Sequence, residues 1–114
     1  KLSIIMPCYN CQSTLAEAVV SVFVQSLKIP FEIIMVDDGS TDGTQRLILE
    51  LAQKYPEIKT LIHEKNRGGG AARNTGIKNS SGDLIFCLDG DDILPPAMLP
   101  RLLNFLDQKN LILF

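Results

Sequence analysis

Short apolar runs alternate along the chain with segments whose apolar residues recur every three or four positions. The runs predict strands at Leu2–Met6, Glu32–Val36, Thr60–Ile62 and Asp83–Leu88. Their nearly continuous apolar character is typical of strands buried on both faces of a sheet. The periodic segments predict helices that begin near Ser13 and near Asp42, and helices at about Ala71–Lys78 and Ala97–Gln108.

This alternation of strands and helices predicts an α/β fold, a three-layer α/β/α sandwich with a mostly parallel sheet. At the first helix, Ser13 is an N-cap candidate, and Thr14 with Glu17 has the spacing of a capping box. The apolar run Leu111–Phe114 is expected to begin a fifth strand.

Composition narrows the class of protein. The chain has 114 residues, 46% of them hydrophobic, and a net charge of -2. This composition argues against disorder, and no apolar run approaches the roughly 20 residues of a transmembrane helix. With 11 basic against 13 acidic residues, the chain has no charge basis for binding nucleic acid.

The ends of the chain and its three cysteines set two further expectations. An odd number of cysteines without a secretory signal does not suit a disulfide scaffold, so we expect a reducing, cytoplasmic environment. The chain starts at Lys1 and ends on an apolar run. We therefore expect residues 1–114 to form one domain that is part of a longer protein. An uncovered apolar strand at its end would favour a homo-oligomer.

Polar residues follow three of the expected strands. They are the segments Pro7–Asn10, Asp37–Ser40 and Asp89–Asp92. Ligands of open α/β sheets bind at the carboxyl ends of the strands, so at least five carboxylates are expected at one cleft. Such a cluster is costly unless a cation or donor groups compensate the charge, and oxygen-only ligands suit Mg²⁺ or Mn²⁺.

A glycine-rich segment, Asn66–Asn74, leads into the third expected helix. Free N–H groups at a helix N-terminus favour an anion such as phosphate. The segment is neither a P-loop nor a dinucleotide fingerprint, because it lacks Gly-Lys and has Arg73 at the position of the third glycine.

Four motifs in order give the chain a resemblance to a known family. Ser3–Asn10, Val36–Asp42, Asn66–Gly76 and Leu88–Asp92 resemble the family 2 glycosyltransferases of the GT-A fold. The resemblance implies a hexosyltransferase of polysaccharide biosynthesis that depends on Mn²⁺ or Mg²⁺. It would transfer a sugar with inversion from a nucleotide diphosphate sugar, a UDP-sugar first of all, to an acceptor glycan, lipid or other hydroxyl compound.

The same resemblance implies roles for residues in the first two motifs. Pro7, Tyr9 and Asn10 would line the pocket for base and ribose. Asp38 would meet the base, with Asp37 beside it.

In the other two motifs, Arg73 would shape the nucleotide pocket, Asp89 would hold the ribose and Asp91 the metal, with Asp92 a neighbouring candidate. The general base that inversion needs would lie beyond Phe114. The chain would then be the donor-binding part of a larger catalytic domain, inactive or weakly active alone. The full-length protein would be cytoplasmic or peripheral to the cytoplasmic face of the membrane.

Cysteine chemistry supplies the rival hypothesis from another class. Cys8 and Cys11 follow a strand and precede a helix, as in a thioredoxin-like redox module. A zinc site would need Cys87 and His63 as well, from three separate strands. We expect Cys87 to lie in a buried strand and His63 at the surface.

Two further alternatives retain a nucleotide ligand. A sugar-nucleotide nucleotidyltransferase also combines a glycine-rich loop with metal-binding aspartates, but places that loop after the first strand, where this chain has Pro7–Asn10. A non-catalytic nucleotide-binding module is the other. Sugar transfer or donor hydrolysis by the chain would argue against it.

Overall fold

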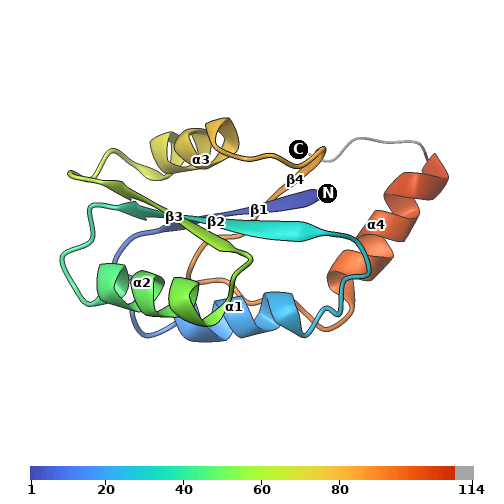
Figure 1. Ribbon diagram of the computed structural model, residues 1–114, viewed down its shortest axis with the longest axis horizontal. Helices are drawn as coiled ribbons and strands as arrows, with labels where there is room; N and C mark the ends of the chain where they lie inside the picture. Colours follow the sequence, from blue (N-terminus) through green and yellow to red (C-terminus); the bar gives the residue numbers. More distant parts are fainter. Residues whose placement is uncertain (110–114) are drawn as a thin grey trace.

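A computed structural model describes residues 1–109 as an α/β fold with a four-stranded, all-parallel sheet (Figure 1). The strand order is β3-β2-β1-β4. The strands are β1 (Leu2–Cys8), β2 (Phe31–Asp38), β3 (Ile58–His63) and β4 (Leu84–Cys87). The helices are α1 (Leu15–Phe23), α2 (Thr44–Lys54), α3 (Gly69–Lys78) and α4 (Met98–Lys109). The expected order of elements and the parallel sheet are confirmed.

The helices cover both faces of the sheet, so that a three-layer sandwich results. Helix α3 lies over one face and α1 and α2 over the other (Figure 1). The face under α3 buries Ile5, Ile34 and Val36 against Ala72. The helix can approach closely because residue 76 is a glycine, and a Cβ atom there would lie only 2.5 Å from the Ile5 side chain.

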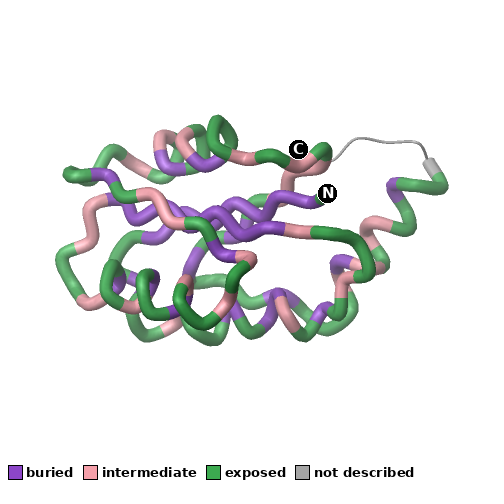
Figure 2. Tube along the Cα trace, in the orientation of Figure 1, coloured by how far each residue is buried: buried purple, intermediate pink, exposed green. Residues whose placement is uncertain are grey.

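The larger core fills the space between the sheet and α1. Alternate residues of β1 and β2 point into it, and Figure 2 shows both strands buried over most of their length. Its fully buried side chains include Ile4, Met6, Ile33, Met35, Leu15, Val19 and Leu99. Burial of the central strands on both sides explains why Ile4–Met6 and Ile33–Val36 are apolar at consecutive positions.

The position of β4 in the sheet shows that one expectation, the burial of Cys87, is wrong. We expected Cys87 in a strand buried on both faces, but β4 is an edge strand among residues 1–109 and Cys87 is exposed. The apolar composition of the run could not distinguish an edge from the centre of the sheet.

The start of α1 also differs from the expectation, because its N-cap residue is Thr14 and not Ser13. The Thr14 hydroxyl does not cap the helix, because it donates to the carbonyl oxygens of Cys11 and Gly90 instead. In α2, the Asp42 carboxylate accepts the Thr44 N–H, so the helix begins two residues later than expected.

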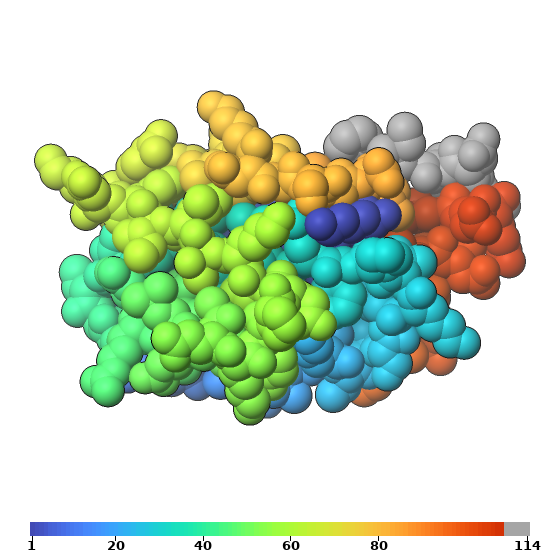
Figure 3. Space-filling model, viewed as in Figure 1, coloured from blue at the N-terminus to red at the C-terminus, as the bar shows by residue number. Residues whose placement is uncertain are grey.

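The molecule measures 43 × 24 × 21 Å, and α4 forms one end of its long axis (Figure 3). None of the helices within residues 1–109 combines the length and the apolar character needed to cross a bilayer. The expected fifth strand, Leu111–Phe114, lies outside the described residues.

Candidate nucleotide and metal site

A pocket of about 240 Å³ opens at the carboxyl ends of β1, β2 and β4. It is the edge at which the sequence predicted a cleft. The pocket brings together six of the eight predicted site residues: Pro7, Tyr9, Asp38, Arg73, Asp89 and Asp91. The rest of its wall consists of Cys8, Cys11, Asn66, Gly69, Ala72 and Gly90.

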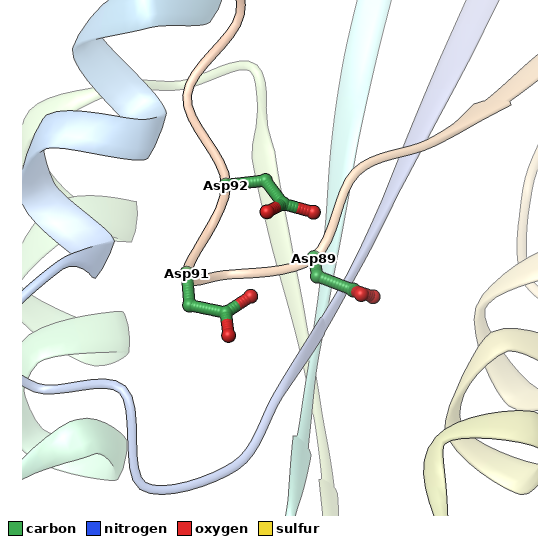
Figure 4. Close-up of side chains that lie close together, drawn as sticks. All are labelled: Asp89, Asp91 and Asp92. Carbon is green, nitrogen blue, oxygen red and sulfur yellow. The ribbon is translucent and has the colours of Figure 1, made fainter.

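Three aspartates of the loop after β4 form an acidic cluster. Oxygen atoms of Asp89, Asp91 and Asp92 lie within 4.8 Å of one another, and all three residues are exposed (Figure 4). Nothing in the described part of the chain donates a hydrogen bond to their carboxylates. Converging carboxylate oxygens with free lone pairs fit a hard divalent cation such as Mg²⁺ or Mn²⁺.

Gly90, in the middle of this loop, fixes its position. Its N–H donates to the Pro7 carbonyl oxygen at 3.1 Å, and its own carbonyl accepts the Thr14 hydroxyl at 3.0 Å. A Cβ atom here would lie 2.7 Å from the Cys11 sulfur and 3.2 Å from the Cys8 sulfur. A glycine is therefore required for the loop to rest on the end of β1.

Asp38, at the end of β2, is buried and surrounded by donors. Its Oδ1 accepts the Arg67 N–H at 2.9 Å and faces His63 Nδ1 at 2.8 Å, and its Oδ2 accepts the Gly68 N–H at 2.9 Å. Burial would raise the pKa of this carboxyl, but the hydrogen bonds from His63, Arg67 and Gly68 outweigh it and lower the pKa. Asp38 therefore stays ionised and holds the turn that enters α3.

His63 corrects the expectation of a surface residue. It is 8% exposed, because α3 covers the end of β3 and Thr75 reaches the second ring nitrogen. Position at a strand end suggested exposure, and only the packing of α3 shows otherwise.

Two predicted residues lie outside the pocket wall. Asp37 is fully buried; its Oδ1 accepts the Ser40 N–H at 3.2 Å and its Oδ2 has no partner within residues 1–109. Asn10 has a positive φ of 47° and joins the end of β1 to the turn after β2, accepting the Thr41 N–H at 2.8 Å. Both residues shape the ends of the strands that form the pocket.

Arg73 brings a cation to the pocket from the first turns of α3. Its guanidinium lies over Gly69, where an added Cβ would be 3.5 Å away. Together with the backbone N–H groups at the start of α3, it places positive charge on the wall to which Asn66 and Asp38 also belong.

Of the six wall residues that the sequence did not assign to the nucleotide site, Asn66, Cys8 and Cys11 have polar or ionisable side chains. The Asn66 amide donates to the Asp38 carbonyl at 3.2 Å. Cys8 and Cys11 are buried behind Gly90. The Cys8 thiol donates to the Met6 carbonyl oxygen at 3.3 Å. The interaction between the two neighbouring thiols raises the pKa of Cys8, which burial raises further, and lowers the pKa of Cys11.

The zinc hypothesis finds no support in residues 1–109. The one metal-ligand cluster there is the aspartate cluster, and His63 is engaged by Asp38 and Thr75. Spacing along the sequence could not reveal that these cysteines and the histidine lie apart.

Comparison with known proteins matches residues 3–114 to the model of "Glycosyl transferase family 2". Over 112 residues the chain is 38% identical to an uncharacterized glycosyltransferase of Haemophilus influenzae; the match covers 98% of this chain and 44% of that protein.

Two solved structures share the fold. Staphylococcus aureus TarS in complex with UDP-GlcNAc has a TM-score of 0.82 and 30% identity over 96% of this chain and 32% of that one. The mannosyltransferase PcManGT of Pyrobaculum calidifontis, in complex with GDP-Man and Mn²⁺, has a TM-score of 0.83 and 25% identity over 92% and 32%. The chain thus spans less than half the length of these relatives.

Proposed function

Since the chain belongs to glycosyl transferase family 2, we propose that it binds the donor, a nucleotide diphosphate sugar, whose sugar is transferred to an acceptor hydroxyl. The observation that carries this proposal is the pocket, where a cationic helix start and an acidic loop face each other across one cavity. Such a pair suits a diphosphate together with a divalent cation.

Different residues of the pocket wall bind different parts of the nucleotide. Pro7, Tyr9 and Asp38 line the part for base and ribose, and Asp89 holds the ribose. The relatives in complex with UDP-GlcNAc and GDP-Man support a nucleotide sugar as the ligand. A UDP-sugar is our first choice of donor.

The metal belongs with Asp91, and Asp89 and Asp92 are near enough to share in holding it. A bound Mn²⁺ or Mg²⁺ would neutralise the charge that grows on the leaving diphosphate. The residues of this chain bind and orient the nucleotide, while Arg73 and the start of α3 offer further positive charge.

We place the acceptor site and the general base for an inverting transfer in a part of the protein outside this chain. The length of the relatives supports this division, since the match covers 44% of the Haemophilus influenzae protein. In this proposal residues 1–114 are the donor half of a larger catalytic domain.

Calorimetry with UDP tests the proposal. We expect binding in the presence of Mn²⁺ that EDTA abolishes and that Asp91→Asn weakens strongly. Asp107→Asn, which removes an exposed carboxylate from α4, is the matched control and should bind as the wild type does. Binding that neither EDTA nor Asp91→Asn alters would refute the metal site, and no binding at all would refute the donor site.

A further inference from the structure

A buried chain of hydrogen bonds joins three elements behind the pocket. Asp38 of β2 faces His63 Nδ1 of β3 at 2.8 Å, and His63 Nε2 faces the Thr75 hydroxyl of α3 at 2.8 Å. His63 and Asp38 are 8% and 2% exposed. The imidazole thus lies between the wall of the pocket and the helix that covers the sheet.

The partners of His63 fix its orientation and the place of one proton. An ionised carboxylate only accepts hydrogen bonds, so Nδ1 carries the hydrogen that points at Asp38. The Thr75 hydroxyl can donate or accept, and it holds the other edge of the ring. Because each nitrogen has a specific partner, the ring has one orientation.

Asp38 is thereby left with little freedom. A carboxylate has about four lone-pair sites, and His63 and the N–H groups of Arg67 and Gly68 use three. The fourth lone-pair site is on Oδ2, which accepts only the Gly68 N–H in the described structure. Asp38 is part of the pocket wall, so this oxygen is the one that a ligand could meet. The network therefore presents a single fixed acceptor to the ligand.

We propose that His63 is a positioning residue that sets the base preference of the pocket through Asp38. This inference rests on the proposed nucleotide function. A fixed acceptor pairs with uracil, which carries N3–H, and opposes cytosine, whose N3 has a lone pair instead. A site built to accept a hydrogen bond rejects an analogue that lacks the donor. Without His63 the carboxylate can rotate, and this discrimination weakens.

Two substitutions of His63 distinguish this positioning role from a merely structural one, because each variant retains a nitrogen atom at only one of the two ring-nitrogen positions. In His63→Asn the amide nitrogen replaces Nδ1, so the bond to Asp38 is retained. In His63→Gln the nitrogen lies further out, toward Thr75, and the bond to Asp38 is lost. The two variants are matched in polarity, and His63→Leu removes both bonds.

The measurement is the ratio of the dissociation constants for CDP and UDP, by calorimetry with Mn²⁺. Loss of a hydrogen bond to a charged group corresponds to about a tenfold change. We expect the ratio to fall about tenfold in His63→Leu and His63→Gln, and by less than about threefold in His63→Asn. Thr75→Val, which loosens the far edge of the ring, should lie between them.

An unchanged ratio in His63→Leu, or equal ratios in His63→Asn and His63→Gln, would overturn the proposal. Amide hydrogen exchange in the free protein gives a readout that needs no nucleotide. The N–H groups of Arg67 and Gly68 should lose protection in His63→Leu and keep it in His63→Asn. Equal protection in all variants refutes the positioning role, whereas a wild type that binds no nucleotide refutes the proposed function itself.

Discussion

Glu32, at the amino ends of the strands, and the aspartates of the loop after β4, at the carboxyl ends, have opposite surroundings. At the amino ends, Glu32 has a side chain that is only 3% exposed and accepts from the Ser3 hydroxyl at 2.6 Å, the Ser81 N–H at 2.7 Å and Lys59 at 2.8 Å. At the carboxyl ends, Asp89 and Asp91 are exposed, with no donor from the described chain.

This difference separates a structural carboxylate from one kept for a ligand. Burial would raise the pKa of Glu32, but Lys59, Ser3 and Ser81 outweigh it and lower that pKa, so the charge is satisfied within the fold. The aspartates repel one another in the free protein. Residue type alone does not distinguish these two kinds of carboxylate, whereas the supply of donors does. Asp38, although it lies at a carboxyl end, is buried among donors as Glu32 is.

The largest effect is expected from removing a ligand carboxylate at the carboxyl end. Asp91→Asn should weaken Mn²⁺-dependent UDP binding about 100-fold, because the metal contributes several kcal/mol. Its melting temperature without ligand should be unchanged or slightly higher, since repulsion falls. A destabilised protein with normal affinity would show that Asp91 belongs to the structural class.

At the amino ends of the strands we expect a loss of stability without a loss of nucleotide affinity. Glu32→Gln places an NH₂ group among donors, which should lower the free energy of unfolding by about 2 kcal/mol. UDP affinity of the folded protein should stay as it is. Chemical denaturation measures the first quantity and calorimetry the second. Glu50→Ala, which breaks an exposed pair with Arg46, is the control and should cost less than about 0.5 kcal/mol.

A smaller effect is expected where the acidic loop rests on β1. Gly90→Ala forces a Cβ against the sulfurs of Cys8 and Cys11, so the loop must shift and UDP affinity should drop about tenfold. Gly70→Ala is the matched control, because a Cβ there meets nothing within 4 Å. Equal affinities of the two variants would contradict a fixed loop.

The smallest effect concerns acid. The pKa values of Glu32 and Asp38 are lowered in the folded protein. At pH values above their pKa in the unfolded chain, which is near 4, both groups therefore stabilise the fold. This stabilisation is lost as the pH falls through the lower folded values. Between pH 7 and 5 the change should stay below about 1 kcal/mol. Urea denaturation at a series of pH values measures this dependence. In Glu32→Gln the free energy of unfolding should fall less steeply with acid than in the wild type.

Much of the fold and of the pocket was predictable from two features of the sequence. These are the periodicity of its apolar residues and the position of polar residues at the ends of the expected strands. Apolar runs between helical patterns predict the parallel sheet, and the carboxyl ends of parallel strands bring Tyr9, Asp38 and Asp91 to one edge, as the structure confirms. The family match favours a glycosyltransferase over the thioredoxin-like and nucleotidyltransferase alternatives. Metal, inversion and location in the cell stay predictions.

What the sequence did not reveal depends on contacts between distant segments. His63 is buried only because α3 covers it, and Cys87 is exposed only because β4 lies at an edge of the described sheet. Thr14 has a capping sequence, but a carbonyl of the acidic loop takes its hydroxyl. Local pattern cannot anticipate a partner 76 residues away.

The two hydrogen bonds of Gly90 have a kinetic consequence. Both backbone groups of the residue between Asp89 and Asp91 are engaged with β1 and the start of α1, so the cost in conformational entropy of ordering this loop is met when the chain folds. If the proposed nucleotide site is correct, the ligand would bind to this wall without first ordering the loop around Gly90. Association should therefore proceed at a rate set by diffusion and electrostatic attraction, and differences in affinity among ligands should reside in how slowly they leave.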